Sequence, residues 1–310
     1  MTGLAFLEEN YPISRLTTVG TGGPARFLAR PSTANDLQQL VSFIDDQGLE
    51  MAVVGLGSNL LAADQGFAGV VVKLVGDLAR VERDGDGLLC GGGASLAVVV
   101  KRAEGLSLAG VEFFCAIPGT VGGAVRMNAG AYGGETRDVL ADALVIGPGG
   151  SRRADPDGLE MSYRRSNVGP GEIVAEARLR LRPGDRDEIR RTVREMQDRR
   201  RAAQPQKVRT FGSVWKNPSA DLTAGRLLEQ CGLKGYAIGG ARISPVHANF
   251  IENTGGATSA DVVALMAEAR RRASELHGIE LHHEVQMLGP IGLHGERPAA
   301  PGGAGAAAAN

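Results

Sequence analysis

The chain has 310 residues, of which 43% are hydrophobic and 22% are charged, a composition typical of a globular protein with two or three domains. Because 34 lysines and arginines balance 35 acidic residues, we expect neither nucleic acid nor an anionic membrane surface as a partner. The three cysteines have no CxxC spacing, which disfavours a disulfide framework and a metal site and favours the reducing cytoplasm.

The two ends of the chain carry no sign of export or of a membrane helix. Residues 1–16 hold acids where a signal peptide needs basic residues, and no stretch reaches the roughly 18 apolar residues of a membrane span. At the other end, the sequence PAAPGGAGAAAAN has no apolar face to bury. We therefore expect no membrane insertion and a disordered tail over residues 291–310.

The first elements predict a strand, a helix and a second strand. Residues 17–31 are extended and interrupted by glycines, with a strand at 25–29. Ser32 or Thr33 can cap the helix that follows, and Gly48 can close it. Residues 51–54 then predict a short buried strand.

This strand leads directly into the loop GLGSNLL at 55–61. Leu61 stands where a dinucleotide fingerprint needs its third glycine, so a nicotinamide Rossmann fold has weak support. Two glycines, a hydroxyl and an amide beyond a strand end can still donate hydrogen bonds to a pyrophosphate. A pyrophosphate contact and a plain turn remain equally open.

The middle of the chain alternates strands with short helices around a glycine-rich stretch. Strands are expected at 70–74 and 88–90, and a helix begins at Ser95 and closes at Gly105. The stretch 113–135, FFCAIPGTVGGAVRMNAGAYGGE, lets backbone N–H groups approach a flat or anionic ligand. The alternative is a glycine-rich hairpin without a ligand. Two strands of one sheet follow at 140–146 and 173–181, separated by a polar loop.

The last third of the chain predicts a separate unit. A charged helix covers 185–203, its arginine run 199–201 is interpreted as a solvated helix end, and Gln204-Pro205 marks a domain boundary. Helices are predicted at 224–230 and 259–277, with an extended run at 247–252 and a closing strand at 284–288.

Six motifs then occur in one order: GSNLL at 57–61, IPGTVGGAVRMNAGAYG at 117–133, YRRS at 163–166, GSVWKNP at 212–218, HANFIEN at 247–253 and HHEVQMLG at 282–289. Together they resemble the UDP-N-acetylenolpyruvoylglucosamine reductase (MurB) family over roughly residues 15–290. The short connection before Gly212 resembles the shorter type of that family, which lacks an extra tyrosine-bearing loop.

The resemblance implies an α+β fold with an FAD-binding region of the vanillyl-alcohol-oxidase (PCMH) type and an α/β substrate-binding domain. We expect one FAD subdomain at 1–74, joined by the closing strand 284–290, a second at 75–204, and the substrate domain at 205–290. It also implies NADPH-dependent reduction, through non-covalent FAD, of UDP-N-acetylglucosamine enolpyruvate to UDP-N-acetylmuramate for peptidoglycan precursors.

The resemblance also assigns residues to the cofactor. In the family the two glycine-rich loops surround FAD, which here implies contacts from Gly55, Gly57, Ser58, Asn59, Leu60, Ile117, Pro118, Gly119, Thr120, Gly122, Gly123, Asn128, Gly130 and Val174.

Three catalytic residues are carried over in the same way. Ser213 is expected to protonate the substrate carbon, Arg164 to meet the substrate carboxylate, and Glu284 to act in protonated form or through a bound water. The expected substrate contacts are Tyr163, Lys216, Asn217, His247 and Asn249. Each of these five also has a plain structural explanation, as a packing, turn or satisfied core residue.

Two departures from the family pattern and two alternative functions remain. Trp215 stands where the family more often has phenylalanine, and QKVRT at 206–210 offers no assignable phosphate clamp. A flavin oxidase of the same fold is one alternative, although no histidine precedes His247 to attach FAD in the glycine-rich region. A catalytically inactive flavin- or sugar-nucleotide-binding protein is the other.

Overall fold

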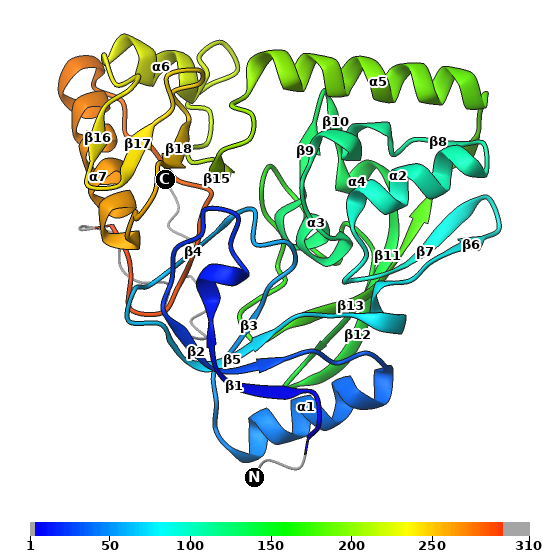
Figure 1. Ribbon diagram of the computed structural model, residues 1–310. Helices are drawn as coiled ribbons and strands as arrows, with labels where there is room; N and C mark the ends of the chain where they lie inside the picture. Colours follow the sequence, from blue (N-terminus) through cyan, green and yellow to red (C-terminus); the bar gives the residue numbers. More distant parts are fainter. Residues whose placement is uncertain (1–3, 294–310) are drawn as a thin grey trace, which may run out of the picture.

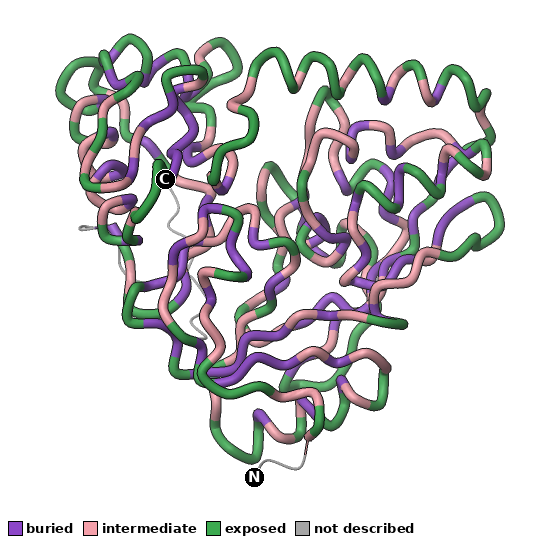
Figure 2. The backbone as a smooth tube through the Cα atoms, in the orientation of Figure 1, coloured by how far each residue is buried: buried purple, intermediate pink, exposed green. Residues whose placement is uncertain are grey.

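A computed structural model describes residues 4–293 and arranges them around three sheets. Figure 1 shows the first sheet at the bottom of the molecule, the second at the right and the third at the upper left. Figure 2 shows the inner strands mostly buried and the outward side of the long upper helix exposed. Within these residues no helix is long and apolar enough to cross a membrane.

The first sheet has four strands in the order β1-β2-β5-β3. Its strands are β1 (Leu7–Pro12), β2 (Pro24–Ala29), β5 (Phe67–Val72) and β3 (Met51–Val53). The strands β2, β5 and β3 run parallel, whereas β1 is antiparallel to β2. The helix α1 (Ala34–Asp46) joins β2 to β3, and Thr33 caps it in a capping box with Asp36 as predicted.

The second sheet has five antiparallel strands in the order β12-β11-β13-β7-β6. They are β12 (Gly150–Ala154), β11 (Leu140–Gly147), β13 (Ile173–Arg180), β7 (Gly87–Gly91) and β6 (Val81–Asp84). The pairing of β11 with β13 confirms that the two predicted strands share a sheet. The expected polar loop 147–171 is wrong at its start, because β12 pairs there with β11 although its residues are almost all exposed.

Helices and short strands surround the second sheet. The helices are α2 (Leu96–Gly105), α3 (Val121–Met127), α4 (Thr136–Val139) and α5 (Arg186–Ala203). The short strands are β8 (Leu108–Ala109) paired with β14 (Arg182–Pro183), and β9 (Gly130–Ala131) paired with β10 (Gly134–Glu135). The glycine-rich stretch is thus a helix followed by a small hairpin.

Three 3₁₀ helices lie at Ile13–Arg15, Gly76–Ala79 and Glu112–Ala116.

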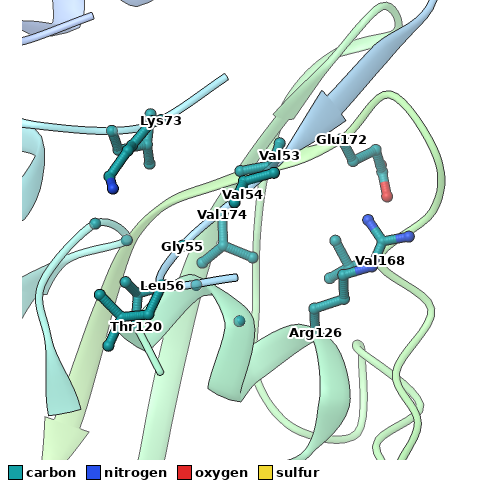
Figure 3. Close-up of a pocket in the computed structure, with 15 residues that line it drawn as sticks. Val53, Val54, Gly55, Leu56, Lys73, Thr120, Arg126, Val168, Glu172 and Val174 are labelled. Atoms are coloured by element: carbon teal, nitrogen blue, oxygen red, sulfur yellow. The ribbon is translucent and has the colours of Figure 1, made fainter. Parts of the chain in front are cut away.

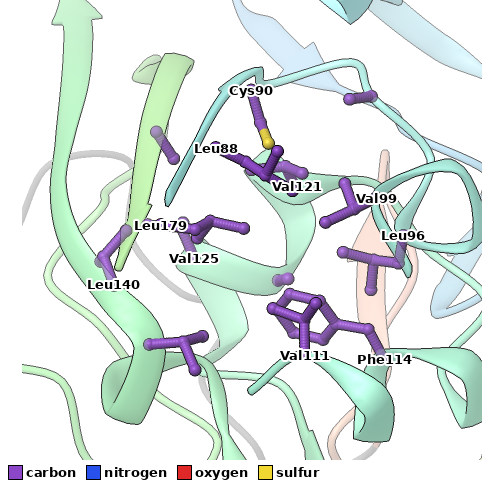
Figure 4. Packing of buried hydrophobic residues seen from close by; sticks show 14 of the residues in the cluster. Leu88, Cys90, Leu96, Val99, Val111, Phe114, Val121, Val125, Leu140 and Leu179 are labelled. Atoms are coloured by element: carbon purple, nitrogen blue, oxygen red, sulfur yellow. The ribbon is translucent and has the colours of Figure 1, made fainter. Parts of the chain in front are cut away.

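The core of this second region gathers around α3. Figure 4 shows Val121 and Val125 of α3 between Leu88 and Leu179 of the sheet and Phe114 of the 3₁₀ helix, all of them buried. The strand β13 belongs to two cores, since Ala177 and Leu179 pack here while Ile173 packs against the first sheet and α1. This strand therefore fixes the first two regions against each other.

The third sheet is antiparallel, with the order β15-β18-β17-β16. Its strands are β15 (Arg209–Ser213), β18 (Phe250–Asn253), β17 (Ala241–Ile243) and β16 (Ala237–Ile238), and its helices are α6 (Ala224–Gln230) and α7 (Ser259–His277). Both helices match the predicted bounds. The strand β18 begins three residues later than the expected run 247–252, because His247 and Ala248 lie in the turn before it.

The chain returns to the first region through β19 (Gln286–Leu288), which pairs in parallel with β4 (Leu60–Ala62). The start of α7 is also tied there, since Asp64 accepts hydrogen bonds from the amides of Ser259 and Ala260 at 2.9 and 3.0 Å. These contacts place β4 and the residues after it beside β19 and the start of α7.

Two expectations need correction. The strand β3 is not buried, because Val53 is 38% exposed and faces a cavity. The predicted disordered tail begins too early, because Leu293 is only 2% exposed and packs in the core of the third region. The rest of that predicted tail, 294–310, lies outside the described residues.

Candidate active site

A cavity of about 390 Å³ lies where the three regions meet. Its walls come from the loop between β3 and β4, from α3 and the segment before it, from the hairpin β9–β10, and from the ends of β15 and of the chain before β19. Segments more than 200 residues apart in the sequence, such as Ser58 and Glu284, therefore face one space.

The loop after β3 presents its backbone to this cavity. Gly57 has φ +65°, and a Cβ there would lie 1.8 Å from the Leu16 carbonyl oxygen, so only glycine fits. Within residues 4–293 the amides of Gly57, Ser58 and Asn59 donate no hydrogen bond to the protein. Such free, clustered N–H groups are the donors that a pyrophosphate requires.

A second loop faces the first across the cavity. The Ser58 hydroxyl donates to the Pro118 carbonyl and joins the two loops. A Cβ on Gly119 or on Gly123 would meet only one atom, at 3.7 and 3.6 Å, so both glycines border open space. Among the described residues, the amides of Gly119, Thr120 and Gly123 also lack a hydrogen-bond partner. The two loops thus form a backbone cradle that fits the diphosphate of FAD.

A narrow side cavity of about 90 Å³ extends from the cradle. Figure 3 shows Val53, Val54 and Val174 around its middle, with Lys73 on one side and the side chains of Arg126 and Glu172 on the other. An apolar slot with polar groups at its ends suits a flat heterocycle. Burial lowers the pKa of Arg126, and the Glu172 carboxylate partly offsets this.

In the wall of the same cavity, Arg164 and Glu284 form an ion pair. The Arg164 Nε lies 3.3 Å from the Glu284 Oε2, and its Nη2 donates to the Gly130 carbonyl at 2.9 Å. Burial raises the pKa of Glu284 above its ordinary value of 4.5, and the cations Arg164 and Lys216 only partly oppose this. Burial thus disfavours the charged carboxylate, whereas the two cations favour it.

Ser213 reaches the cavity through an irregular strand end. The register of β15 with β18 shifts between Thr210 and Ser213, and Gly212 lies between them with φ +83°. Such a bulge redirects the side chain that follows it. The Ser213 hydroxyl donates no hydrogen bond within the described residues and lines the same cavity as Arg164 and Glu284. The structure therefore brings the three predicted catalytic residues together.

Comparisons with known proteins agree with this geometry. Residues 25–153 match the model of an FAD binding domain, and residues 204–288 match that of the UDP-N-acetylenolpyruvoylglucosamine reductase C-terminal domain. The UDP-N-acetylenolpyruvoylglucosamine reductase of Anaeromyxobacter dehalogenans is 43% identical over 302 residues, 96% of this chain and 91% of that protein. The chain belongs to the UDP-N-acetylenolpyruvoylglucosamine reductase family.

Further members of the family show the same extent of similarity. The reductase 2 of Symbiobacterium thermophilum is 42% identical over 280 residues, 90% of this chain and 91% of that protein. The crystal structure of the Thermus caldophilus reductase (MurB) superposes with a TM-score of 0.78 at 36% identity, covering 90% of this chain and 97% of that one. The expected fold, an FAD-binding region of the PCMH type followed by the family's C-terminal domain, is confirmed.

Most of the expected cofactor residues line the cavities. Those at the main cavity are Gly55, Gly57, Ser58, Asn59, Leu60, Ile117, Pro118, Gly119, Thr120, Gly123 and Gly130, and the side cavity adds Gly122 and Val174. Asn128 is the exception, because it is fully buried and its side chain bonds only to protein groups. Its side chain therefore has a structural role, and its expected contact with FAD stays a prediction.

Of the expected substrate residues, Asn249 is buried and His247 is half-buried. Asn249 accepts from the Trp215 amide and donates to the Trp215 carbonyl, both at 2.9 Å, and is 4% exposed. His247 packs edge-on against Phe250, and its Nδ1 accepts from the Asn249 amide. Burial lowers the pKa of His247, as expected for a ring enclosed by the fold. Neither side chain lines the cavity, and their expected contacts with the substrate stay predictions.

The other three expected substrate residues lie around the cavity rather than in its wall. Tyr163 is 51% exposed, with the Arg164 guanidinium 5.0 Å from its ring. The Oδ1 of Asn217 accepts from the Ala224 amide at the start of α6. The positive charge of Lys216 partly opposes the rise in the pKa of Glu284. Trp215 is buried in the hydrophobic core of the third region.

Sequence analysis missed polar residues that only the tertiary structure brings to the cavity. Arg126, Arg200, Gln204 and Gln286 all line it. Arg200 was expected in a solvated helix end, but it lies in the last turn of α5 and lines the cavity. The Arg200 Nε donates to the Gln204 Oε1 at 2.9 Å. The connection from α5 to β15, residues 204–208, has only five residues, which leaves no room for an additional loop.

Proposed function

We propose that the cavity reduces the enolpyruvyl ether of UDP-N-acetylglucosamine to the lactyl ether, UDP-N-acetylmuramate, with NADPH as reductant and FAD as carrier. The observation that supports this most strongly is the convergence of Arg164, Ser213 and Glu284 on one cavity with the backbone cradle. The substrates are soluble nucleotides of the cytoplasm, and we place the reaction there.

When bound, FAD supplies a hydride taken from NADPH to the terminal carbon of the enolpyruvyl double bond. The free amides of the two loops would hold its diphosphate, and the side cavity at Val174 would accept a flat ring of the cofactor. These contacts come from backbone and small residues, so they fix the cofactor without adding charged side chains near the reacting carbon. The residues that act on the substrate come from other segments of the same cavity wall.

Arg164 meets the substrate carboxylate. As the hydride adds, negative charge develops on the neighbouring carbon and its carboxylate, and a guanidinium is a planar, permanently charged donor pair for that group. The hydrogen bond from Nη2 to Gly130 and the contact with Glu284 fix the guanidinium before the substrate arrives. A preorganised donor of this kind contributes about 3–4 kcal/mol to transition-state stabilisation.

Ser213 donates the proton that completes the addition. A serine hydroxyl is a weak acid in water, but the carbanion-like carbon is strongly basic, so transfer is favourable once the two are in contact. The hydroxyl donates to no group of the described protein and is available for the substrate. Hydride and proton together reduce the double bond, and the serine regains its proton from solvent.

Glu284 acts through a bound water or in its protonated form. Burial raises its pKa, which favours the neutral form that does not oppose the developing anion. In that form it can donate a hydrogen bond to the substrate carboxylate while its other oxygen still faces Arg164. Lys216 beside it and Arg200 at the cavity wall supply positive charge for the substrate diphosphate.

The direct test is NADPH oxidation by the purified FAD-loaded protein, with and without the enolpyruvyl substrate, with oxygen consumption measured in parallel. We expect NADPH oxidation to depend on the substrate and one lactyl product to form for each NADPH. Rapid oxygen consumption with no dependence on the substrate would show an oxidase instead. No turnover despite bound FAD would show a binding protein.

A further inference from the structure

The Arg164 side chain projects from a tight, strained turn. Ser162 and Arg165 exchange both backbone hydrogen bonds at 3.0 Å, and Arg164 between them has φ +56°, a left-handed conformation that arginine rarely adopts. Such a conformation persists only where the surrounding structure enforces it. Something outside the turn must therefore hold it in place.

Asn128 supplies that support. Its Nδ2 donates to the Ser162 carbonyl at 3.0 Å and to the Glu135 Oε2 at 2.9 Å, while its Oδ1 accepts from the Arg137 amide at 3.0 Å. The side chain is 0% exposed, so these bonds do not compete with water. Every polar atom of the amide group is used, and one of its bonds goes directly to the turn.

The same residue also stabilises the group that the guanidinium contacts. The Arg164 Nη2 donates to the Gly130 carbonyl, and Gly130 pairs with Glu135 in the β9–β10 hairpin. Glu135 is the carboxylate that accepts from Asn128. Asn128 thus connects the backbone that carries Arg164 with the hairpin that holds the end of its side chain.

We propose that Asn128 is a positioning residue for Arg164, which it serves without touching the substrate or FAD. This inference rests on the proposed function. It predicts a separation between the two halves of the reaction. Arg164 acts only when the enolpyruvyl substrate is reduced, so a defect at Asn128 should slow that half and spare the reduction of the flavin by NADPH.

The test variant is Asn128→Asp, which keeps size and tolerance of the left-handed conformation at φ +40° but places a carboxylate against Glu135 and Ser162. The matched control is Asn167→Asp, the same change on an exposed side chain of the loop that carries the Arg164 turn, whose amide donates to the Gly158 carbonyl instead. Stopped-flow absorbance then measures each half-reaction under anaerobic conditions.

We expect Asn128→Asp to slow reoxidation of the reduced flavin by the substrate roughly 10- to 100-fold, the cost of misplacing one catalytic group. Reduction by NADPH and the bound FAD content should match those of Asn167→Asp. An equal loss in both half-reactions, or no loss in either, would overturn the inference. Wild-type reduced flavin that does not respond to the substrate would instead overturn the proposed function.

A second pair of variants covers the case in which Asn128→Asp does not retain FAD. Asn128→Gly also permits the left-handed backbone and removes the side chain without adding charge. In an Arg164→Ala background, Asn128→Gly should cause no additional loss of the substrate half-reaction, because residues that act as a unit are not additive. Additive losses would contradict the inference. Loss of FAD from both Asn128 variants would also contradict it, because Asn128 would then support the fold as a whole and not Arg164 in particular.

Discussion

Two parts of the main cavity's wall are built in different ways. The cofactor part is made of backbone, with free amides and small residues from the loops around Ser58 and Thr120. The substrate part is made of side chains, with Arg164, Ser213 and Glu284 arriving from three separate segments. A backbone site tolerates few side chains, whereas a side-chain site depends on a supporting network. Variants in the two parts should therefore fail in different half-reactions.

The largest effect is expected for Ser213→Ala. Loss of a positioned general acid costs roughly 10²- to 10⁴-fold, and here it should fall only on reoxidation of the reduced flavin by the substrate. Stopped-flow absorbance of each half-reaction measures this. Ser219→Ala is the control, since the Ser219 hydroxyl accepts from Leu222 in an exposed turn outside the cavity. Equal rates for the two variants would remove Ser213 from the mechanism.

Arg164→Lys should cost about 10²-fold in the same half-reaction, because an ammonium keeps the charge but loses the planar donor pair. Arg165→Lys makes the same change at the exposed neighbour in the turn and should be nearly neutral. Single-turnover rates at saturating substrate distinguish the two. A defect confined to reduction of the flavin by NADPH would contradict the role of Arg164 in binding the substrate carboxylate.

Asn249→Ala tests an expected substrate residue that is buried in the structure. It leaves the buried N–H and C=O groups of Trp215 unpaired, which should lower the free energy of unfolding by about 2–4 kcal/mol. Denaturant unfolding of the FAD-loaded protein measures this loss. A variant of normal stability with a raised KM would restore Asn249 to the substrate site.

Gly123→Val should weaken the binding of FAD alone, because Gly123 lies in the cofactor part of the cavity wall. Its Cβ would meet only the Thr120 Oγ1, at an ordinary contact distance of 3.6 Å, so the chain should fold while the cradle is filled. We expect FAD affinity to fall roughly 10- to 100-fold, the effect of overpacking by 1–3 kcal/mol. Flavin fluorescence titration measures it, with Gly105→Ala at an open helix position as control. Unchanged affinity would contradict the cradle.

The smallest effect concerns the pH dependence of stability. The pKa of Glu284 is raised in the folded protein, so its contribution to stability is fully present below its ordinary value of 4.5 and is lost as the pH rises through the raised value. The stability of the wild type relative to Glu284→Gln should therefore fall as the pH increases above 4.5. Denaturant unfolding of both proteins across this pH range measures the difference in their free energies of unfolding. A wild type that gains stability relative to Glu284→Gln as the pH rises would contradict a raised pKa.

The same contrast explains what the sequence could predict. The role of Gly57 and Gly123 could be predicted from the neighbouring sequence, because a glycine-rich loop can be recognised without knowledge of the fold. Most of the helices and strands likewise follow from hydrophobic periodicity and helix caps. Asn128 and Asn249 could not be assigned from their motifs, since motif spacing does not say whether a polar side chain points into a cavity or into the core. Arg126 and Arg200 were missed because only tertiary packing turns them toward the cavity.

The most direct test of the account is the visible spectrum of the purified protein, followed in one anaerobic cuvette through addition of NADPH and then of the enolpyruvyl substrate. We predict flavin absorbance that bleaches with NADPH and returns in full with the substrate, with UDP-N-acetylmuramate as the product. Reduced flavin that remains bleached after the substrate is added, or a protein that cannot be loaded with FAD, would contradict it.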